Sequence, residues 1–310
     1  MSATPAAPAG ASPADVTPVS EPAAQFEMFN KEWQNMSQQD NWDGFRIEAA
    51  NQVTKHMQAA HTLFLGTQLR ECGYIYQFGP AFQSEDQRTM MVAKTGLDGG
   101  VNGRLIKKLG SCWELKGSLN SHLKEQQRNM HEGSIEYNGS AWTGGAKLAW
   151  QGTWIAGASF SQKVLPSMQL GGDLMLIAMG GISSIGTIGL RWAKHKDIFS
   201  AALSRQPDPK SPTGAPLHEC RLQYVRKCSD RLSLGTELKL SQDMESGMSM
   251  GYEYSFRMAK VQGMLDTDGK VSCSVSDYTG FGFSGVIDYF RGDYKFGMLM
   301  HVLPQQENPQ

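Results

Sequence analysis

A two-residue alternation of apolar and polar side chains constrains the fold of this chain more than any other feature. From about residue 53 onward, apolar residues recur at every second position, for example at Leu232, Leu234 and Leu238, with Ser, Gly, Glu and Lys between them. Successive side chains of a β-strand point to opposite faces, so this period predicts strands with one apolar and one polar face. The same pattern recurs in four further runs: 113–120, 248–256, 270–276 and 293–302.

Short turn signals separate these runs. Asp98-Gly99-Gly100, Asn138-Gly139 and Asp268-Gly269 are typical of tight hairpin connections. A strand of about ten residues followed by a short turn, repeated to the C-terminus, predicts a meander of antiparallel hairpins. The Pro-rich stretch 206–216 interrupts this rhythm and is expected to form a loop, since proline cannot donate to a strand ladder.

Strand length favours a membrane β-barrel over a soluble sheet. Ten residues match a tilted bilayer crossing, whereas strands of soluble sheets average about five or six. Aromatic residues such as Trp142, Trp150 and Phe281 stand near the ends of the apolar faces, where interfacial girdles lie in such barrels. About 250 residues, at about ten per strand plus turns, give roughly 18 or 19 strands. A soluble β-sandwich that binds a ligand remains an alternative, because its strands also alternate.

Composition limits the classes of function. The 34 Gly and 13 Pro in 310 residues argue against a helical chain. The 29 Lys and Arg balance the 30 Asp and Glu, which excludes a strongly basic nucleic-acid-binding protein. Five scattered cysteines indicate neither a disulfide framework nor a zinc site. No catalytic spacing is present either, so we expect a protein that is not an enzyme and needs no cofactor or metal.

The N-terminal part has a different character. Residues 1–25 are rich in Ala and Pro and are expected to be disordered, with neither a secretory signal nor the arginines of a mitochondrial presequence. Helical spacing of Phe26, Phe29 and Trp33 predicts a helical segment over 26–52. The barrel is then expected over 53–304, with a short tail at 305–310. The missing secretory signal favours an organellar over a bacterial outer membrane.

Some glycines and histidines allow more than one interpretation. The pairs Gly171-Gly172 and Gly180-Gly181 either face lipid and admit a partner helix, or form bends that face the lumen. Residues 280–285 satisfy G-x-G-x-x-G, but no helix pattern follows, so these glycines are expected to relieve crowding in a curved strand. His56 and His61 are interpreted as lumen or interface residues rather than metal ligands.

The last strand looks like the sorting signal of mitochondrial outer-membrane barrels. That signal runs polar, any, Gly, any, any, apolar, any, apolar. Residues 295–302 match it, with the four defined positions taken by Lys295, Gly297, Met300 and Val302.

Two further stretches resemble the channel-forming subunit of the TOM complex, the protein translocase of the mitochondrial outer membrane, within the eukaryotic porin superfamily. One is 260–271, which resembles a late-strand motif of that family. The other is 51–63, which resembles the family's entry into its first strand. The resemblance covers about residues 40–304, and its motif positions in the late strand are Lys260, Gly263, Asp266 and Thr267.

The resemblance implies both architecture and function. It implies a 19-stranded barrel whose first and last strands pair in parallel, with the helical segment inside the pore. It also implies a protein-conducting channel for unfolded precursors, whose presequences polar and acidic lumen groups would recognise. The implied partners are precursor proteins, the receptor and small single-helix TOM subunits, further copies of the chain and the lipid bilayer, but no nucleic acid. Strand parity puts four acidic candidates for presequence contact on the polar face: Glu237, Glu253, Asp266 and Asp288.

A metabolite channel of the voltage-dependent anion type is the alternative function. It would share the fold, the sorting signal and the membrane. Such a channel is expected to have a net positive lumen and to begin almost at once with its pore helix. The near-neutral charge and longer leader of this chain favour the protein-conducting channel.

Overall fold

A computed structural model describes seven stretches of the chain. Four parts named in the predictions lie outside the described residues: residues 1–22 of the leader, the C-terminal tail, most of the Pro-rich loop, and Gly180. The described stretches are 23–39, 41–66, 73–123, 129–178, 181–207, 216–243 and 246–302.

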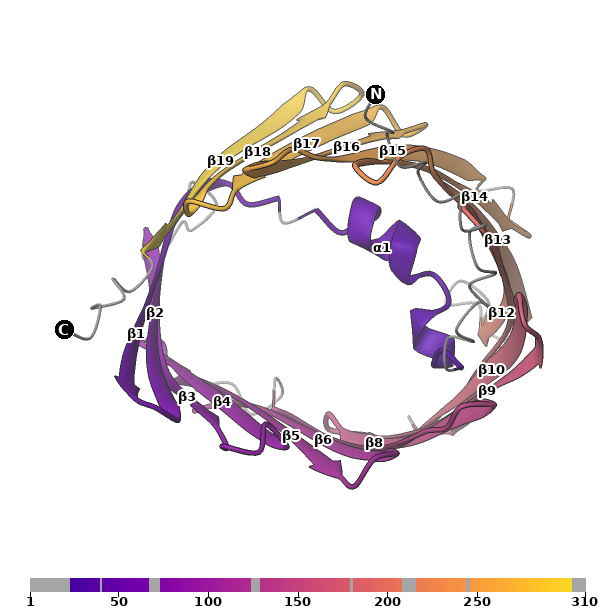
Figure 1. Cartoon of the computed structure of the whole chain (residues 1–310), viewed down its shortest axis with the longest axis horizontal. Helices are drawn as coiled ribbons and strands as arrows, with labels where there is room; N and C mark the ends of the chain where they lie inside the picture. The colour runs from indigo at the N-terminus through magenta and orange to yellow at the C-terminus, as the bar shows by residue number, and fades with distance from the viewer. Residues whose placement is uncertain are drawn as a thin grey trace, which may run out of the picture.

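The strands form one 19-stranded sheet that closes on itself as a barrel (Figure 1). Each strand pairs with its neighbours in sequence, and β1 also pairs with β19. The predicted membrane-type barrel is confirmed, and the sandwich alternative is wrong, because a sandwich consists of two stacked sheets. The strands are β1 Gly44–Thr54, β2 Met57–Leu65, β3 Tyr74–Gln83, β4 Thr89–Gly96, β5 Gly100–Leu109, β6 Trp113–His122, β7 Met130–Asn138, β8 Trp142–Trp150, β9 Trp154–Leu165, β10 Met168–Ala178, β11 Ile182–Lys194, β12 Asp197–Pro207, β13 Pro216–Lys227, β14 Leu232–Ser241, β15 Gly247–Ser255, β16 Ala259–Asp266, β17 Lys270–Asp277, β18 Phe281–Asp288 and β19 Asp293–Val302.

The closing pair is parallel because the number of strands is odd. Every hairpin reverses the chain, so β19 runs in the same direction as β1. A bilayer offers no water to unpaired backbone groups, and an open edge there would be costly. The two strands therefore pair in parallel, with Ile47 opposite Met300 and Ala49 opposite Val302.

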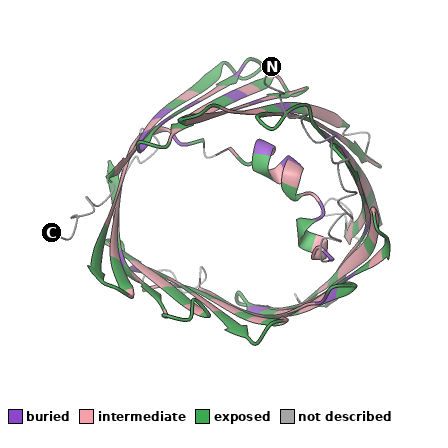
Figure 2. Ribbon diagram, in the orientation of Figure 1, coloured by how far each residue is buried: buried purple, intermediate pink, exposed green. Residues whose placement is uncertain are grey.

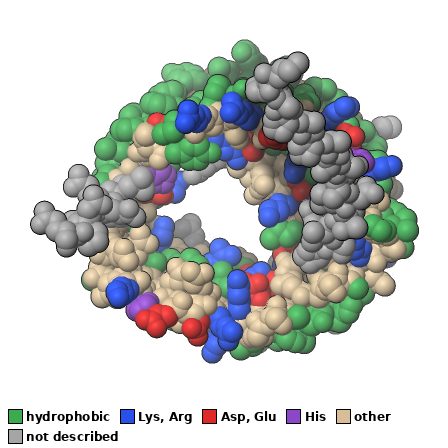
Figure 3. Space-filling view, in the orientation of Figure 1, with side chains coloured by type: hydrophobic (Ala, Val, Ile, Leu, Met, Phe, Trp, Pro, Cys, Tyr) green, Lys and Arg blue, Asp and Glu red, His purple; other side chains and the backbone are tan. Residues whose placement is uncertain are grey.

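The alternation seen in the sequence separates the outer face from the lumen. Large apolar side chains on the outer face are exposed, among them Ile188, Leu203 and Phe160. Charged side chains gather around the opening, while the outer edge of the molecule is largely apolar (Figure 3). Figure 2 shows buried residues in α1 and at scattered positions of the wall, with exposed and intermediate residues along the strands. The aromatic residues Trp142 and Trp150 lie at the two ends of β8 on the outer face, as the girdle interpretation predicted.

The helical part of the chain is shorter than predicted. A 3-10 helix η1 (Phe26–Met28) and a helix α1 (Lys31–Ser37) lie inside the barrel, and neither is long or apolar enough to cross a bilayer. The expected helical segment to residue 52 is wrong, because β1 already begins at Gly44, whose φ of 95° turns the chain into the wall. Phe45, Ile47 and Ala49 alternate along a strand held by β2 and β19.

The stretch 51–63 is likewise not one strand. It comprises the end of β1, a two-residue turn and most of β2. His56 lies in that turn, which contains neither Gly nor Pro and therefore has no turn signal in the sequence.

Cysteines placed across the closing pair test the parallel register. In a variant whose five native cysteines are replaced by serine, Ala49→Cys with Val302→Cys should form an intrachain disulfide on mild oxidation. The control, Ala49→Cys with Met298→Cys, keeps both residues on the outer face, but Met298 pairs with Phe45, four positions away. Mass spectrometry of the digested monomer should find the first cross-link only. Equal yields in both variants would contradict the register.

Candidate functional site

The N-terminal segment, defined as residues 23–39 and 41–43, follows one side of the inner wall (Figure 1). It starts at the turn between β7 and β8, where the amide of Ala23 donates to the carbonyl of Ser140 at 3.1 Å. The helices η1 and α1 then pack against β9–β10 and β13–β16. The segment ends beside β18, where the Ser284 hydroxyl donates to the carbonyl of Trp42 at 3.2 Å.

Pairs of glycines on neighbouring strands make room for the aromatic side chains of this segment. Gly171 and Gly189 face each other across β10 and β11, and a Cβ on either would lie 2.9 or 2.8 Å from the ring of Phe26. Gly235 and Gly251 face each other across β14 and β15 beneath Trp33. Only glycine at these wall positions lets an aromatic ring lie directly on the sheet backbone.

Trp42 occupies a third glycine site at the closing end of the wall. A Cβ on Gly282 of β18 would lie 3.4 Å from its ring, and one on Gly297 of β19 would overlap it. Gly282 belongs to the G-x-G-x-x-G stretch and relieves crowding as predicted, since an added Cβ would lie 3.2 Å from Leu299 and 3.4 Å from Trp42, whereas one on Gly285 would meet no atom within 4 Å. The two readings of the Gly171-Gly172 pair each hold for one residue: Gly171 faces the lumen and Gly172 faces outward.

Trp33 and Met36 anchor α1 to the wall. They are 3% and 2% exposed and form a cluster with Ile198 and Val225 of the inner wall. Full burial of an apolar side chain of this size contributes about 1.5–3 kcal/mol. The burial of these two side chains therefore offsets the unfavourable free energy of forming a helix of only seven residues.

Charged and polar groups fix the segment at intermediate points. Arg191 of β11 makes a bidentate ion pair with Glu32 of α1, at 2.8 and 2.6 Å, and also donates to the carbonyl of Phe29 at 3.0 Å. Nearer the start of the segment, the Gln25 amide donates to Glu136 at 2.6 Å and to Asn138 at 2.8 Å. Both sites are partly shielded from water, where charge-assisted hydrogen bonds are strongest.

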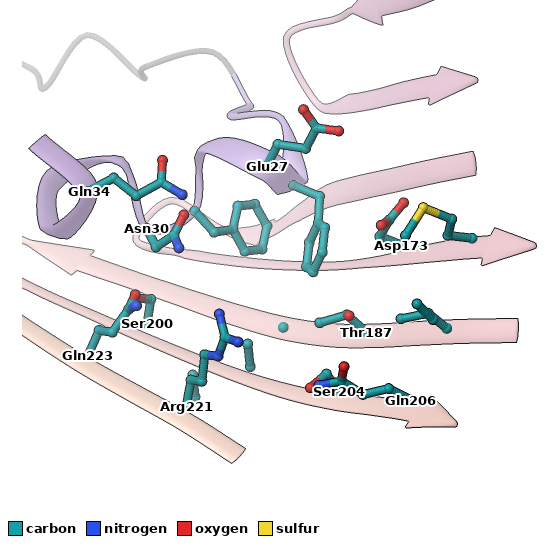
Figure 4. A pocket seen from close by; sticks show the side chains of 17 residues that line it. Glu27, Asn30, Gln34, Asp173, Thr187, Ser200, Ser204, Gln206, Arg221 and Gln223 are labelled. Carbon is teal, nitrogen blue, oxygen red and sulfur yellow. The ribbon is translucent and has the colours of Figure 1, made fainter. Parts of the chain in front are cut away.

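A cavity of about 490 Å³ lies between the N-terminal segment and the wall of β10–β13 (Figure 4). Its lining combines the Phe26 and Phe29 rings with polar wall groups such as Thr187, Ser204 and Gln206. At one end stand Asp173 and Glu27, and Glu27 forms an ion pair with Lys147 of β8. The cavity is open to the lumen, so the N-terminal segment does not pack tightly against β10–β13 at this point.

The four acidic residues predicted to contact presequences lie on the inner wall but differ in access. Glu237 is 6% exposed and accepts from Gln223 at 2.7 Å, and Asp288 is 8% exposed and caps the turn after β18 through the amide of Arg291. Glu253 is more open and pairs with Lys260 at 3.0 Å. One carboxylate oxygen of Asp266, at the end of β16, is buried without a hydrogen bond. Their contact with presequences remains a prediction, which burial weakens for Glu237 and Asp288.

The predicted late-strand motif has an evident structural role. Lys260 points into the lumen toward Glu253, whereas Gly263 faces outward and lies beneath the ring of Tyr252. Thr267 stands in the turn after Asp266, and its hydroxyl accepts from the amide of Met248 at 3.0 Å. These residues therefore fix the β15–β16 pairing and the turn into β17.

The predicted sorting signal is divided between the two faces of β19. Lys295 and Gly297 face the lumen, while Met300 and Val302 face outward beside β1. Its use as a sorting signal remains a prediction.

Three residues of the site were not predicted from the sequence. Glu32, Glu27 and Asp173 all lie at the contact between segment and wall. Parity along β10 would have placed Asp173 on the lumen face, but nothing in the sequence indicated which wall the helix contacts.

His61 is an interface residue: its ring lies against Phe78 and its Nδ1 is 2.7 Å from the Tyr76 hydroxyl on the outer face. His56 lies in the β1–β2 turn, 3.1 Å from Glu85. Within the described stretches, no three His, Cys, Asp or Glu side chains are placed to hold a metal ion.

The opposite wall, formed by β2–β6, faces the open lumen (Figures 1 and 3). Its inward positions alternate with the exposed outer residues and carry both polar and apolar side chains. Gln58, Thr62 and Gln77 supply amides and a hydroxyl, and Lys94 and Arg104 supply positive charge. This mixed surface can contact a passing chain without holding it tightly.

Comparison with known proteins identifies a family and several relatives of this chain. The profile of the eukaryotic porin family matches residues 23–297. A protein of Arabidopsis thaliana named probable mitochondrial import receptor subunit TOM40-2 is 24% identical, over 88% of this chain and 87% of its own length. The mitochondrial import receptor subunit TOM40 of Saccharomyces cerevisiae is 26% identical, over 81% of this chain and 69% of its own. A TOM40 homolog of Xenopus laevis is 23% identical, over 73% and 66%.

A side chain at the glycine beneath Trp33 should displace α1. Gly235→Val puts a branched side chain where a Cβ alone would lie 2.6 Å from Met36. The open-state conductance in a planar bilayer should then rise, because the helix no longer occupies the lumen. Gly285→Val is the matched control, since Gly285 lies on the outer face of β18 with no atom within 4 Å of an added Cβ. Unchanged conductance in both variants would contradict the role of this glycine.

Charge reversal tests the ion pair between helix and wall. Glu32→Arg or Arg191→Glu alone should weaken the docked segment by about 1.5–3 kcal/mol, the range for hydrogen bonds to charged groups. Single-channel records should show frequent steps to a higher conductance in each single variant. The double variant should restore steady conductance in part, because the ion pair re-forms but a carboxylate at position 191 cannot donate to the carbonyl of Phe29. If the double variant is as unsteady as the single ones, the pair does not hold the segment.

Proposed function

The chain belongs to the eukaryotic porin family, and we propose that it is the protein-conducting channel of the mitochondrial outer-membrane translocase. The observation that carries this proposal is the open lumen beside a firmly docked N-terminal segment. The names of the three relatives point the same way, because each is a mitochondrial import receptor subunit TOM40 or a homolog of it. The mitochondrial outer membrane is accordingly the proposed location.

The dimensions of the barrel suit an unfolded chain. For 19 strands, spaced about 4.8 Å apart and tilted about 40°, the backbone diameter is about 38 Å. Side chains on both walls and one internal helix leave about 15 Å, which admits an extended chain or one α-helix of about 10–12 Å. A folded domain of about 100 residues, with a radius of gyration of about 13 Å, does not fit.

Transport through this channel needs positioning rather than chemistry. A basic presequence is attracted by carboxylates on the inner wall, and apolar lumen side chains hold a hydrophobic segment weakly enough to release it. Glu253 is the most open of the predicted contacts, and Glu27 with Asp173 adds a second acidic point across the cavity. Ion pairs between these groups and wall lysines keep each attraction modest.

The proposed partners follow from this role. Precursor proteins pass through the lumen, and receptor and small single-helix subunits of the translocase bind the outer wall or the rims. Further copies of the chain join in the same complex. Lipid surrounds the rest of the apolar outer face.

Block by a presequence peptide tests the proposed function. The purified barrel in a planar bilayer should show cation preference and voltage-dependent block by a basic amphipathic peptide, because the peptide enters a lumen with accessible carboxylates. A scrambled peptide of equal charge that lacks amphipathic spacing is the control. Anion preference with indifference to the peptide would favour the metabolite channel instead.

Neutralising individual carboxylates locates the contact. Glu253→Gln should weaken the peptide block about two- to fivefold, the range for one exposed ion pair. Glu237→Gln is the matched control on the neighbouring strand, since its carboxylate is buried against Gln223. Equal effects of the two variants would remove Glu253 from the proposed contacts.

A further inference from the structure

A groove crosses the outer face of the barrel over β9–β13, with a volume of about 510 Å³. Its floor is formed by small residues: Gly172 of β10, Gly186 of β11 and Ala158 of β9. Exposed side chains flank them, since Gly172 pairs with Phe160 and Ile188 on its two sides. The remaining apolar walls are Leu174 and Leu203.

One end of this groove carries an arginine and a histidine. Arg205 of β12 and His218 of β13 pair across the strands, face outward with the groove and are exposed. The next residues on the same outward face of each strand are Pro207 and Pro216, which form the last pair at that rim of the barrel. Neither side chain has a hydrogen bond or ion pair within the described part of the chain. The next outward position along β13, Cys220, lies opposite Leu240 of β14, and the backbone amide of Gln242 donates to the carbonyl of His218 at 3.1 Å.

We propose that this groove binds one phospholipid with an anionic headgroup, whose phosphate lies on Arg205 and His218 and whose acyl chain lies over Gly172 and Gly186. The proposal rests on the membrane location given by the proposed function. Arg205 stands next to the rim at headgroup depth with His218 beside it, and basic groups beside an apolar cleft recognise anionic lipids. The guanidinium matches phosphate geometry better than any other side chain.

A lipid fits this groove better than a partner helix does. An outward arginine beside a docked helix would need a carboxylate from that helix at one defined depth, whereas every anionic lipid already carries its charge at the rim. Phe160 and Ile188 stand on the strands either side of Gly172, so the groove floor between these two exposed side chains is one strand wide, which suits a single acyl chain more than a helix of about 10–12 Å.

Native mass spectrometry of the purified full chain tests the proposal. The protein in mild detergent is titrated with phosphatidylinositol or phosphatidylcholine, and the bound fraction is measured. The wild type should retain one phosphatidylinositol in preference to phosphatidylcholine. Arg205→Gln with His218→Gln should lower that retention at least about fivefold, the factor expected from one basic group at a membrane surface. Gly186→Leu, whose added Cβ meets only Leu174 at 3.9 Å, should fill the groove and lower the retention of both lipids.

Arg226→Gln is the matched control. Arg226 is also an outward cation on β13, but it lies at the opposite rim and is paired with Asp197 at 3.8 Å. Equal lipid retention in all variants, loss with Arg226→Gln as well, or a co-purified single-helix protein in the groove in place of lipid would each overturn the proposal. Conductance and peptide block are recorded for every variant, so that a failure of the channel function is distinguished from a failure of the lipid site.

Discussion

Satisfaction of backbone hydrogen bonds in a bilayer is the constraint on which the rest of this structure depends. Without water, every amide and carbonyl of a spanning segment needs a partner within the protein. Antiparallel hairpins meet this need for all strands but the outermost two. With 19 strands those two run in the same direction, and the β1–β19 pair closes the barrel in parallel. The final strand must therefore carry outward apolar residues, Met300 and Val302, that match those of β1.

Closure of so wide a barrel leaves a large lumen, in which the N-terminal segment must be held against the wall. A wide barrel has no packed core, so an internal segment can be held only by local features of the wall. Glycines on adjacent strands provide them, because each pair exposes sheet backbone on which Phe26, Trp33 or Trp42 can lie. Arg191 adds orientation through Glu32. The segment is thus fixed to one side, and the opposite side remains open for transport.

Much of the fold was accessible from the sequence, since strand period and turn residues are local signals. Strand and turn lengths predicted roughly 18 or 19 strands, the family resemblance implied 19, and alternation placed the aromatic residues on the apolar face. The start of β1 was not accessible, because the predicted helical segment runs to residue 52, and only the partners β2 and β19 reveal Phe45, Ile47 and Ala49 as a strand. The glycine sites were not predictable either. Gly235 and Gly251 are ordinary strand glycines until the fold brings Trp33 over them.

The central claim is that a precursor chain passes through the open lumen beside the N-terminal segment. A photo-reactive amino acid at Gln77, which faces the lumen on β3, tests it in mitochondria that hold an arrested precursor. Its neighbour Phe78 faces outward on the same strand and is the matched control. The account predicts cross-links to the precursor from position 77 and none from position 78. Cross-links from both positions, or from position 78 alone, would contradict it.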